Sequence, residues 1–175
     1  MNKKIERYID LLKQYNEKTN IYSKKAYDKL EFHINDSLQL SALLPNSKLT
    51  IFDFGSGSGL PSIPLSINNL QHTIYAIESK QRKTDFLNHV KTTLELNNLK
   101  IINNNLFEWK APCSPDIITA KAFAPIEKIK RLYNRFKGES TICYIPISEN
   151  QATILKKDPN ISIIQETHFF YAKLS

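Results

Sequence analysis

The chain has 175 residues with 41% hydrophobic and 23% charged side chains, which suits one globular domain and excludes a disordered or fibrous chain. No apolar run reaches the roughly 18–20 residues needed to cross a bilayer, and the charged N-terminus lacks the apolar segment of a signal peptide. The net charge of +7 favours an anionic partner such as nucleic acid, although a compositional bias towards Lys, Asn and Ile would produce the same excess.

The first part of the chain is predicted to be helical. Apolar residues from Ile5 to Tyr15 recur at helical spacing, which predicts a helix over Lys3–Glu17. A second helix is predicted over Phe32–Leu44, before the break at residues 45–47. We expect a single domain over residues 1–175, in which residues 1–47 form an N-terminal helical cap and residues 48–175 form an α/β core.

The rest of the chain alternates between strands and helices. The predicted strands are Leu49–Phe54, Thr73–Ile77, Lys100–Ile102, Ile117–Ala120, Thr141–Ile147 and Ile161–Tyr171. The predicted helices are Lys80–Leu96, Pro125–Phe136 and Glu149–Lys156. Alternation of this kind predicts an α/β, doubly wound fold with a mostly parallel sheet that is covered on both faces.

A glycine-rich loop follows the first predicted strand and precedes a helix. Three of the four glycines of the chain, Gly55, Gly57 and Gly59, lie in the segment Asp53–Pro61. Glycine there lets the backbone adopt a positive φ and come close to a ligand. Because doubly wound sheets bind ligands at the carboxyl ends of their strands, this loop is the candidate binding site.

The spacing of the loop favours a nucleoside without phosphates. Dinucleotide sites use GxGxxG, whereas this loop has GxGxG, and Pro61 removes a backbone donor that a phosphate would need. A P-loop lysine is absent. S-adenosyl-L-methionine is the common ligand of this kind. Glu78, at the end of the second strand, is placed to accept hydrogen bonds from ribose hydroxyls, or is a solvated charge.

The chain resembles the GidB (RsmG) family of bacterial small-subunit ribosomal RNA guanine-N7 methyltransferases. The similarity runs from about Leu11 to about Ile164. The segments that carry it are Tyr15–Asn16 with Asn20–Ile21, His33–Leu38, Asp53–Leu65, Gln81–Leu87 and Ala120–Ala124. His33–Leu38 reads His-Ile-Asn-Asp-Ser-Leu, and Asp53–Leu65 departs from the family's glycine-loop motif at Ser62. The resemblance implies a Rossmann-like class I methyltransferase fold.

The resemblance also implies site residues. The family's cofactor contacts fall on Gly55, Leu60, Leu106, Phe107 and Lys121. With the rest of the loop and the strand-end acid, the expected cofactor-binding residues are Gly55, Gly57, Gly59, Leu60, Glu78, Leu106, Phe107 and Lys121. The resemblance places His33 and Asp36 on the substrate side, where they are candidates to orient the substrate, although each also suits a purely structural role on a helix.

The chain departs from the family pattern at four places. Lys121 replaces an arginine, Tyr22 replaces a threonine, and Ile147–Ser148 replace Lys-Gly after the fifth strand. The chain is also expected to lack a last strand that closes a hairpin. Outside the motifs, the charges at Lys80, Arg82 and Lys83 suit either phosphate contact or a solvated helix face, and Trp109 suits either base stacking or an aromatic core.

Together these patterns predict a monomeric, S-adenosylmethionine-dependent enzyme that methylates guanine N7 in 16S ribosomal RNA of the small subunit. Since N7 has a free lone pair, no general base is needed and no catalytic residue is assigned. Two alternatives stay open at this point. One is a catalytically weakened remnant of the family that binds RNA or cofactor, and the other is a small-molecule methyltransferase.

Overall fold

A computed structural model of the protein describes residues 2–175. The helices are α1 (Lys3–Lys18), the 3-10 helix η1 (Lys24–Lys29), α2 (Leu30–Leu43), α3 (Ser62–Asn68), α4 (Gln81–Thr93), α5 (Ile126–Phe136) and α6 (Glu149–Leu155). The strands are β1 (Thr50–Phe54), β2 (Thr73–Glu78), β3 (Leu99–Asn103), β4 (Ile117–Thr119), β5 (Ile142–Ile147), β6 (Ser162–Glu166) and β7 (Phe169–Leu174).

The strands form one seven-stranded sheet in the order β3-β2-β1-β4-β5-β7-β6. The first five strands in sequence are parallel, and β7 pairs antiparallel with both β5 and β6. The chain leaves β1 towards β2 and β3 on one side and returns to β4 and β5 on the other. This reversal puts the topological switch point between β1 and β4, where doubly wound sheets bind ligands. The predicted α/β class is confirmed.

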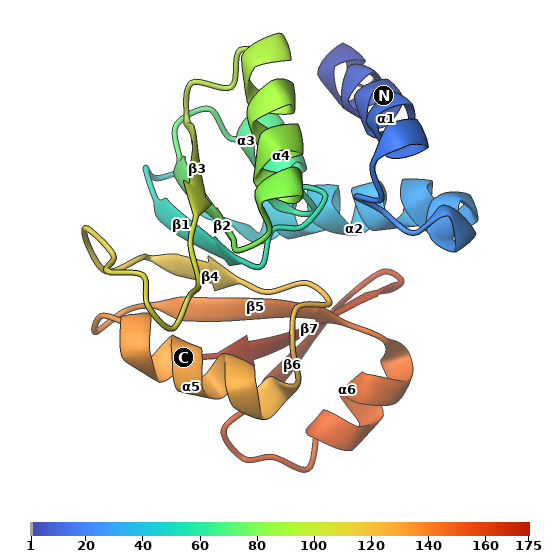
Figure 1. Ribbon diagram of the computed structural model, residues 1–175. Helices are drawn as coiled ribbons and strands as arrows, with labels where there is room; N and C mark the ends of the chain where they lie inside the picture. The colour runs from blue at the N-terminus through green and yellow to red at the C-terminus, as the bar shows by residue number, and fades with distance from the viewer. Residues whose placement is uncertain (1) are drawn as a thin grey trace.

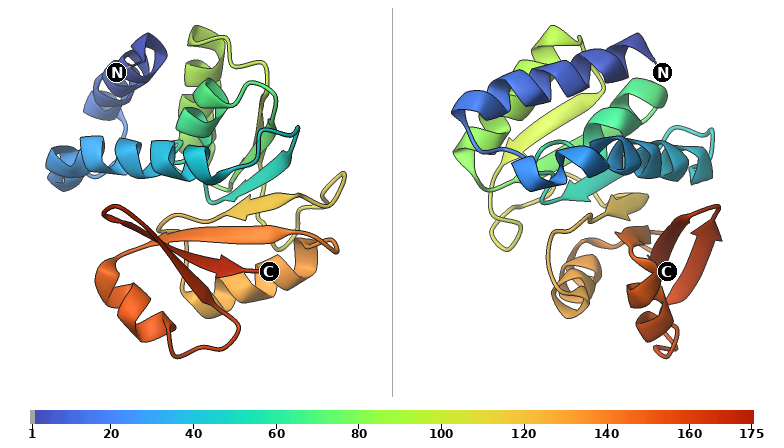
Figure 2. Two further views of the ribbon diagram at one scale, coloured as in Figure 1. Left: turned by 180° about the vertical axis from the view of Figure 1, so that it is seen from behind. Right: turned by 90° about the vertical axis from the view of Figure 1, so that its right-hand side faces the viewer.

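Helices cover both faces of the sheet. Figure 1 shows α1 to α4 on one face and α5 and α6 on the other, and Figure 2 shows the same layers from two further sides. Each face of the sheet has its own hydrophobic core, because successive side chains of a strand point to opposite faces. In β1, Ile51 packs with the first set of helices, while Phe52 and Phe54 pack towards α5. Trp109 is buried against Phe52 and Phe136 in the second core, so it belongs to the aromatic core and not to a stacking surface.

Local sequence signals explain where several helices begin. The side chain of Asn2 accepts a hydrogen bond from Lys4 N at 2.8 Å and caps α1. Ser148 and Gln151 form a reciprocal capping box at the start of α6. Ser148, which stands where the family has a different residue, therefore has a structural role as a helix cap.

The end of the chain differs from the prediction. A single strand over Ile161–Tyr171 is wrong, because this segment divides into β6 and β7, which turn at Thr167 with φ +56°. The expectation that a closing strand is missing is wrong for the same reason, since β7 runs back between β5 and β6. The turn contains no glycine, proline or asparagine, so the apolar pattern continues through it without a break.

The remaining predicted elements are confirmed with small shifts of their ends, and η1 is an addition to them. Among residues 2–175, no helix is long and apolar enough to cross a membrane.

Candidate functional site

The site lies at the edge of the sheet where the carboxyl ends of β1, β2, β3 and β4 meet. The loops that leave these strands enclose a pocket of about 360 Å³, which we call the glycine-loop pocket. Its main lining residues are Gly55, Glu78, Ser79, Lys80, Lys83, Asn104, Asn105, Leu106, Phe107, Ala122, Phe123 and Lys128. This volume is within the range of small-ligand sites, which is roughly 300–1,000 Å³.

The three glycines of the loop all have a positive φ, at +67° for Gly55, +57° for Gly57 and +95° for Gly59. They serve different purposes. A Cβ on Gly55 would overlap the ring of Phe123, and one on Gly59 would overlap the side chain of Ile63. A Cβ on Gly57 would have room, with its nearest neighbours at 3.6 Å. A Cβ on Gly57 would therefore make only ordinary van der Waals contacts, with Gly55 O and Lys83 Nζ, whereas Gly59 is buried within the loop.

Glu78 holds the loop and also faces the pocket. One carboxylate oxygen accepts a hydrogen bond from Gly57 N at 3.0 Å, and the other accepts one from Lys80 N at 2.9 Å. The residue is only 7% exposed. Because each carboxylate oxygen can accept two hydrogen bonds, both keep acceptor capacity for a ligand in the pocket.

Buried groups from distant elements support the loop from below. The hydroxyl of Tyr8 in α1 donates a hydrogen bond to Ser58 O at 2.7 Å, so the N-terminal helix holds the loop directly. Under the loop, Asp53 accepts a hydrogen bond from Thr119 Oγ1 at 2.9 Å. Burial raises the pKa of the Asp53 carboxyl.

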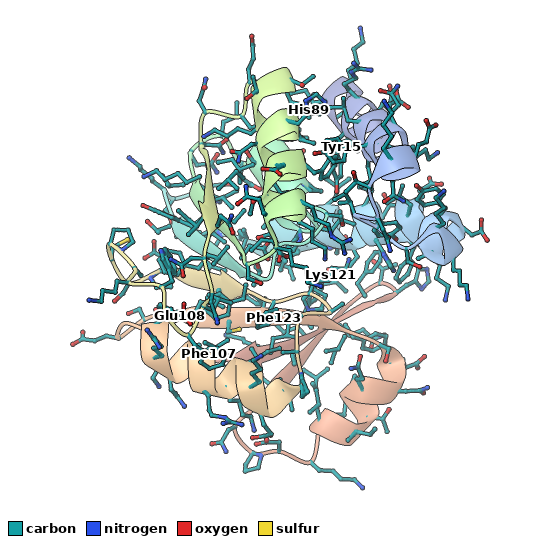
Figure 3. The ribbon with its side chains drawn as sticks, viewed as in Figure 1. Tyr15, His89, Phe107, Glu108, Lys121 and Phe123 are labelled. Atoms are coloured by element: carbon teal, nitrogen blue, oxygen red, sulfur yellow. The ribbon has the colours of Figure 1, made fainter. Side chains whose placement is uncertain are left out.

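Aromatic rings form the other wall of the pocket. Leu106 is buried and Phe107 is exposed at the rim. The ammonium of Lys128 lies 5.1 Å from the centroid of the Phe107 ring and 5.7 Å from that of Phe123. Figure 3 shows Phe107, Phe123 and Lys121 along this edge of the molecule. Two flat rings beside a cation suit a planar ligand such as a nucleobase.

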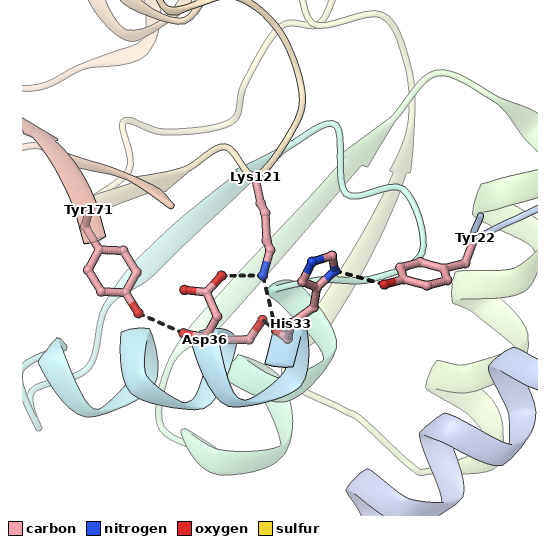
Figure 4. A network of polar contacts seen from close by, with 6 residues as sticks. Tyr22, His33, Asp36, Lys121 and Tyr171 are labelled. Carbon is pink, nitrogen blue, oxygen red and sulfur yellow. Dashed lines mark hydrogen bonds and ion pairs between the residues drawn. The ribbon is translucent and has the colours of Figure 1, made fainter. Parts of the chain in front are cut away.

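Lys121 points away from this wall towards helix α2. Its ammonium forms an ion pair with Asp36 and also donates to His33 O at 3.1 Å (Figure 4). Burial lowers the pKa of Lys121, and the neighbouring Asp36 carboxylate opposes that shift. On the other side of Asp36, the hydroxyl of Tyr171 in β7 donates to the Asp36 backbone oxygen at 2.9 Å. The hairpin that the sequence did not predict therefore supports the site.

The contacts of Tyr22 assign the tautomer of His33. The Tyr22 hydroxyl lies 3.2 Å from Ala26 O and 2.9 Å from His33 Nδ1. A hydroxyl has one proton and a carbonyl oxygen can only accept, so both contacts are satisfied when Tyr22 donates to Ala26 O and His33 Nδ1–H donates to Tyr22. This arrangement leaves His33 Nε2 as an acceptor. Burial, followed by the charge of Lys121, lowers the pKa of His33 and favours its neutral form.

Two further cavities share the lining residue Ala122 with the glycine-loop pocket. The first, of about 230 Å³, is called the connecting cavity and is bordered by Tyr22, His33, Gly57, Leu60, Lys121 and Ala122. The second, of about 510 Å³, is called the outer cleft. Its walls carry the aromatic pair Phe32 and Phe169 together with His33, Asp36 and Lys121. Ala122 borders all three spaces, and Lys121 borders the two further cavities, so the three spaces lie next to one another.

The structure thus brings the predicted residues together in two groups. Gly55, Glu78, Leu106 and Phe107 line the glycine-loop pocket. His33, Gly57, Leu60 and Lys121 border the connecting cavity, and Asp36 lies beyond them in the outer cleft. Gly59 lines neither the glycine-loop pocket nor the connecting cavity.

Sequence reasoning missed Tyr22 as a partner of His33, and it missed Phe123 and Lys128 as lining residues. It singled out Lys83 for phosphate contact or a solvated face, and the structure also places this residue in the lining of the pocket. The matched segment Ala120–Ala124 was a signal for Phe123.

The comparisons with known proteins agree with this geometry. The model of the GidB family, described as rRNA small subunit methyltransferase G, matches residues 1–174. The chain is 31% identical over 167 residues to "Ribosomal RNA small subunit methyltransferase G" of Helicobacter acinonychis, which covers 90% of this chain and 93% of the relative. It is 40% identical over 143 residues to the protein of the same name from Gluconobacter oxydans, covering 81% and 72%.

Solved structures share the fold at lower identity. A SAM-dependent methyltransferase from Aquifex aeolicus superposes with a TM-score of 0.63 at 16% identity, covering 94% of this chain and 98% of that one. The DhpI–SAH complex superposes with a TM-score of 0.64 at 12% identity, covering 98% and 94%. These likenesses establish the class I methyltransferase fold.

Proposed function

Since this chain belongs to the GidB family of small-subunit rRNA methyltransferases, we propose that it transfers a methyl group from S-adenosylmethionine to N7 of a guanine in 16S rRNA. The observation that carries the proposal is the match over residues 1–174 together with the meeting of three cavities at Ala122. A methyltransferase needs a donor site and an acceptor site with a common opening, because the reacting atoms must come within roughly 3–3.5 Å of each other.

The glycine-loop pocket fits the cofactor. Glu78 would accept hydrogen bonds from the ribose hydroxyls, and Leu106 and Phe107 would lie against the adenine. Because Gly57 has no side chain, its backbone could come close to the rest of the cofactor. When bound there, S-adenosylmethionine supplies a methyl group on a positively charged sulfur, which is already activated for transfer.

The outer cleft and the connecting cavity are the proposed acceptor site. Guanine N7 carries a free lone pair, so no side chain has to remove a proton from it. The chain's residues would instead position the base, with Phe32 and Phe169 offering rings for stacking and His33 Nε2 offering an acceptor to the base N–H groups. Lys121 would act through Asp36 and His33, by holding helix α2 at the opening.

The proposal extends to how the protein works as a whole. We propose a single domain in which residues 1–47 hold the glycine loop through Tyr8 and frame the acceptor site through α2. We also propose that the enzyme acts as a monomer in the cytoplasm, where its rRNA substrate is assembled and where two free cysteines, Cys113 and Cys143, are stable.

The test is methylation of small ribosomal subunits from a bacterial strain that lacks its own enzyme. The expected product is a single new N7-methylguanine in 16S rRNA, detected by chemical cleavage of the strand at that base. Cofactor affinity is measured separately by calorimetry. Cofactor binding without any methylated guanine would overturn the proposed activity and leave a cofactor-binding remnant, and methylation of free small molecules alone would overturn the substrate class.

A further inference from the structure

We propose that a groove beside the glycine loop binds the sugar–phosphate backbone of the rRNA next to the target nucleotide. This basic groove, of about 660 Å³, lies between the end of α1, the start of η1 and the first turn of α4. Its charged lining residues are Glu17, Lys18, Lys24, Lys25, Arg82 and Lys83. The inference rests on the proposed function, since it assigns the surface that holds the same RNA substrate.

The charges of the groove are unbalanced. Five cations and one carboxylate line it, and Lys83 is the only one of the cations that is partly buried. Within residues 2–175, the ion pairs of the protein are made by Lys121 and Lys130, so none of the groove cations has an acidic partner. Neighbouring like charges repel one another, and phosphates placed between them would relieve that repulsion.

The backbone that carries these cations is held in place. Asn16 is buried, and its side-chain oxygen accepts hydrogen bonds from Ile21 N at 2.7 Å and Tyr22 N at 3.0 Å. Its side-chain nitrogen donates to Tyr22 O at 2.8 Å and to the Tyr27 hydroxyl at 2.6 Å. The segment between α1 and η1 is therefore an ordered turn, and ordering before binding lowers the entropy cost of gripping a flexible strand.

The position of the groove favours a nucleic acid strand over an acidic protein. Ile21 and Ser23 border both the groove and the connecting cavity, and Lys83 borders the groove, the connecting cavity and the glycine-loop pocket. A strand whose phosphates lie in the groove is thus continuous with the place where one of its bases has to enter. An acidic peptide would gain nothing from that continuity.

The test compares two variants with the same net charge. The groove variant combines Lys18→Gln, Lys24→Gln, Lys25→Gln and Arg82→Gln, and leaves Lys83 in place because it lines the cofactor pocket. The control variant combines Lys48→Gln, Lys110→Gln, Lys156→Gln and Lys157→Gln, which are exposed and lie outside the groove. Both lose four positive charges, from +7 to +3. The probes are protein-free 16S rRNA and intact small subunits, each measured by filter binding at several salt concentrations.

The groove variant is expected to bind protein-free rRNA at least tenfold more weakly than the control. The slope of log affinity against log salt concentration should be shallower by roughly 2–3, because each lost phosphate contact reduces the size of that slope by about 0.7. Its affinity for S-adenosylmethionine should equal that of the wild type. Equal rRNA affinity and equal salt dependence in the two variants would refute RNA binding by the groove. The proposed function would still stand in that case if the wild-type protein methylates 16S rRNA.

A loss of affinity for intact subunits but not for protein-free rRNA would also overturn the inference, since it would identify a ribosomal protein as the partner. Failure of the wild type to bind or methylate rRNA would instead refute the proposed function together with the groove.

Discussion

The hydroxyl of Tyr22 lies 2.9 Å from Nδ1 of His33 and joins a loop of the N-terminal cap to the first turns of α2. The resemblance to the family places a threonine at this position. Since the same hydroxyl donates to Ala26 O, it keeps the proton of His33 on Nδ1 and leaves Nε2 free to accept.

Tyr22→Phe is therefore expected to shift the proton of His33 towards Nε2. The acceptor towards the substrate is then lost, and kcat/KM should fall by roughly 3- to 10-fold, as expected for one hydrogen bond of about 1 kcal/mol. Nitrogen NMR of the labelled imidazole reads the tautomer directly. Tyr15→Phe is the control, because the Tyr15 ring packs on Phe86 and His89 of α4, away from His33. An unchanged tautomer in Tyr22→Phe would contradict the assignment.

Lys121→Ala should be strongly destabilising. It leaves the Asp36 carboxylate, which is 5% exposed, without its partner, and breaking a buried pair costs about 3–5 kcal/mol. Lys121→Arg should keep most of the stability and retain or raise activity, because arginine restores a forked donor. Urea unfolding and the subunit methylation assay measure both. Lys130→Ala removes a more exposed ion pair that solvent screens, and it should cost far less stability. Equal losses in the two alanine variants would refute the buried role of Lys121.

Gly57→Val should weaken binding of S-adenosylmethionine and its demethylated product by at least about tenfold while the chain stays folded. A β-branched residue disfavours the φ of +57°, at a cost of about 1–2 kcal/mol, and its methyl groups extend beyond a Cβ that already lies 3.6 Å from Lys83 Nζ. Calorimetry measures binding, and circular dichroism checks folding. Gly57→Ala should have a smaller effect, and the wild type should not bind NAD. Wild-type affinity in Gly57→Val would show that the loop does not approach the cofactor.

Acidification should destabilise the fold through His33. Its pKa is lowered below the ordinary 6.5 in the folded protein, so the unfolded chain binds more protons between the folded-state pKa and pH 6.5. The free energy of unfolding should therefore rise with pH across that window, and His33 should add no slope above it. Burial lowers the pKa of His72 in the same direction, so the wild type is compared with His33→Gln. The slope assigned to His33 is the part that this variant loses.

Thr167→Gly should stabilise the protein by about 0.5–1 kcal/mol. Thr167 turns the chain between β6 and β7 with φ +56°, which a β-branched residue tolerates poorly and glycine adopts freely. Urea unfolding measures the gain. Glu166→Gly, one residue earlier in β6, should instead lose stability, because glycine weakens a strand. A loss in Thr167→Gly would show that the threonine makes a contact that outweighs its strain.

The sequence by itself determined the features that depend on local chemistry. The alternation of strands and helices follows from apolar periodicity, and the position of the binding loop follows from the clustering of Gly55, Gly57 and Gly59, whose positive φ values are intrinsic to glycine. Glu78 could be placed at the same edge because the carboxyl ends of parallel strands meet there. The family could be recognised because its motifs lie in short continuous segments.

Only the tertiary structure decided which side chains meet. Tyr22, Lys121 and Tyr171 come from three separate parts of the chain, and they meet His33 and Asp36 of helix α2 with no local pattern to pair them. The matched segment Ala120–Ala124 pointed to Phe123 but not to the position of its ring over Gly55. The β6–β7 turn at Thr167 could not be predicted either, since it carries no distinctive turn residue. Ion pairs and buried hydrogen bonds depend on distances of a few ångströms between segments far apart in sequence, and packing of the whole chain sets those distances.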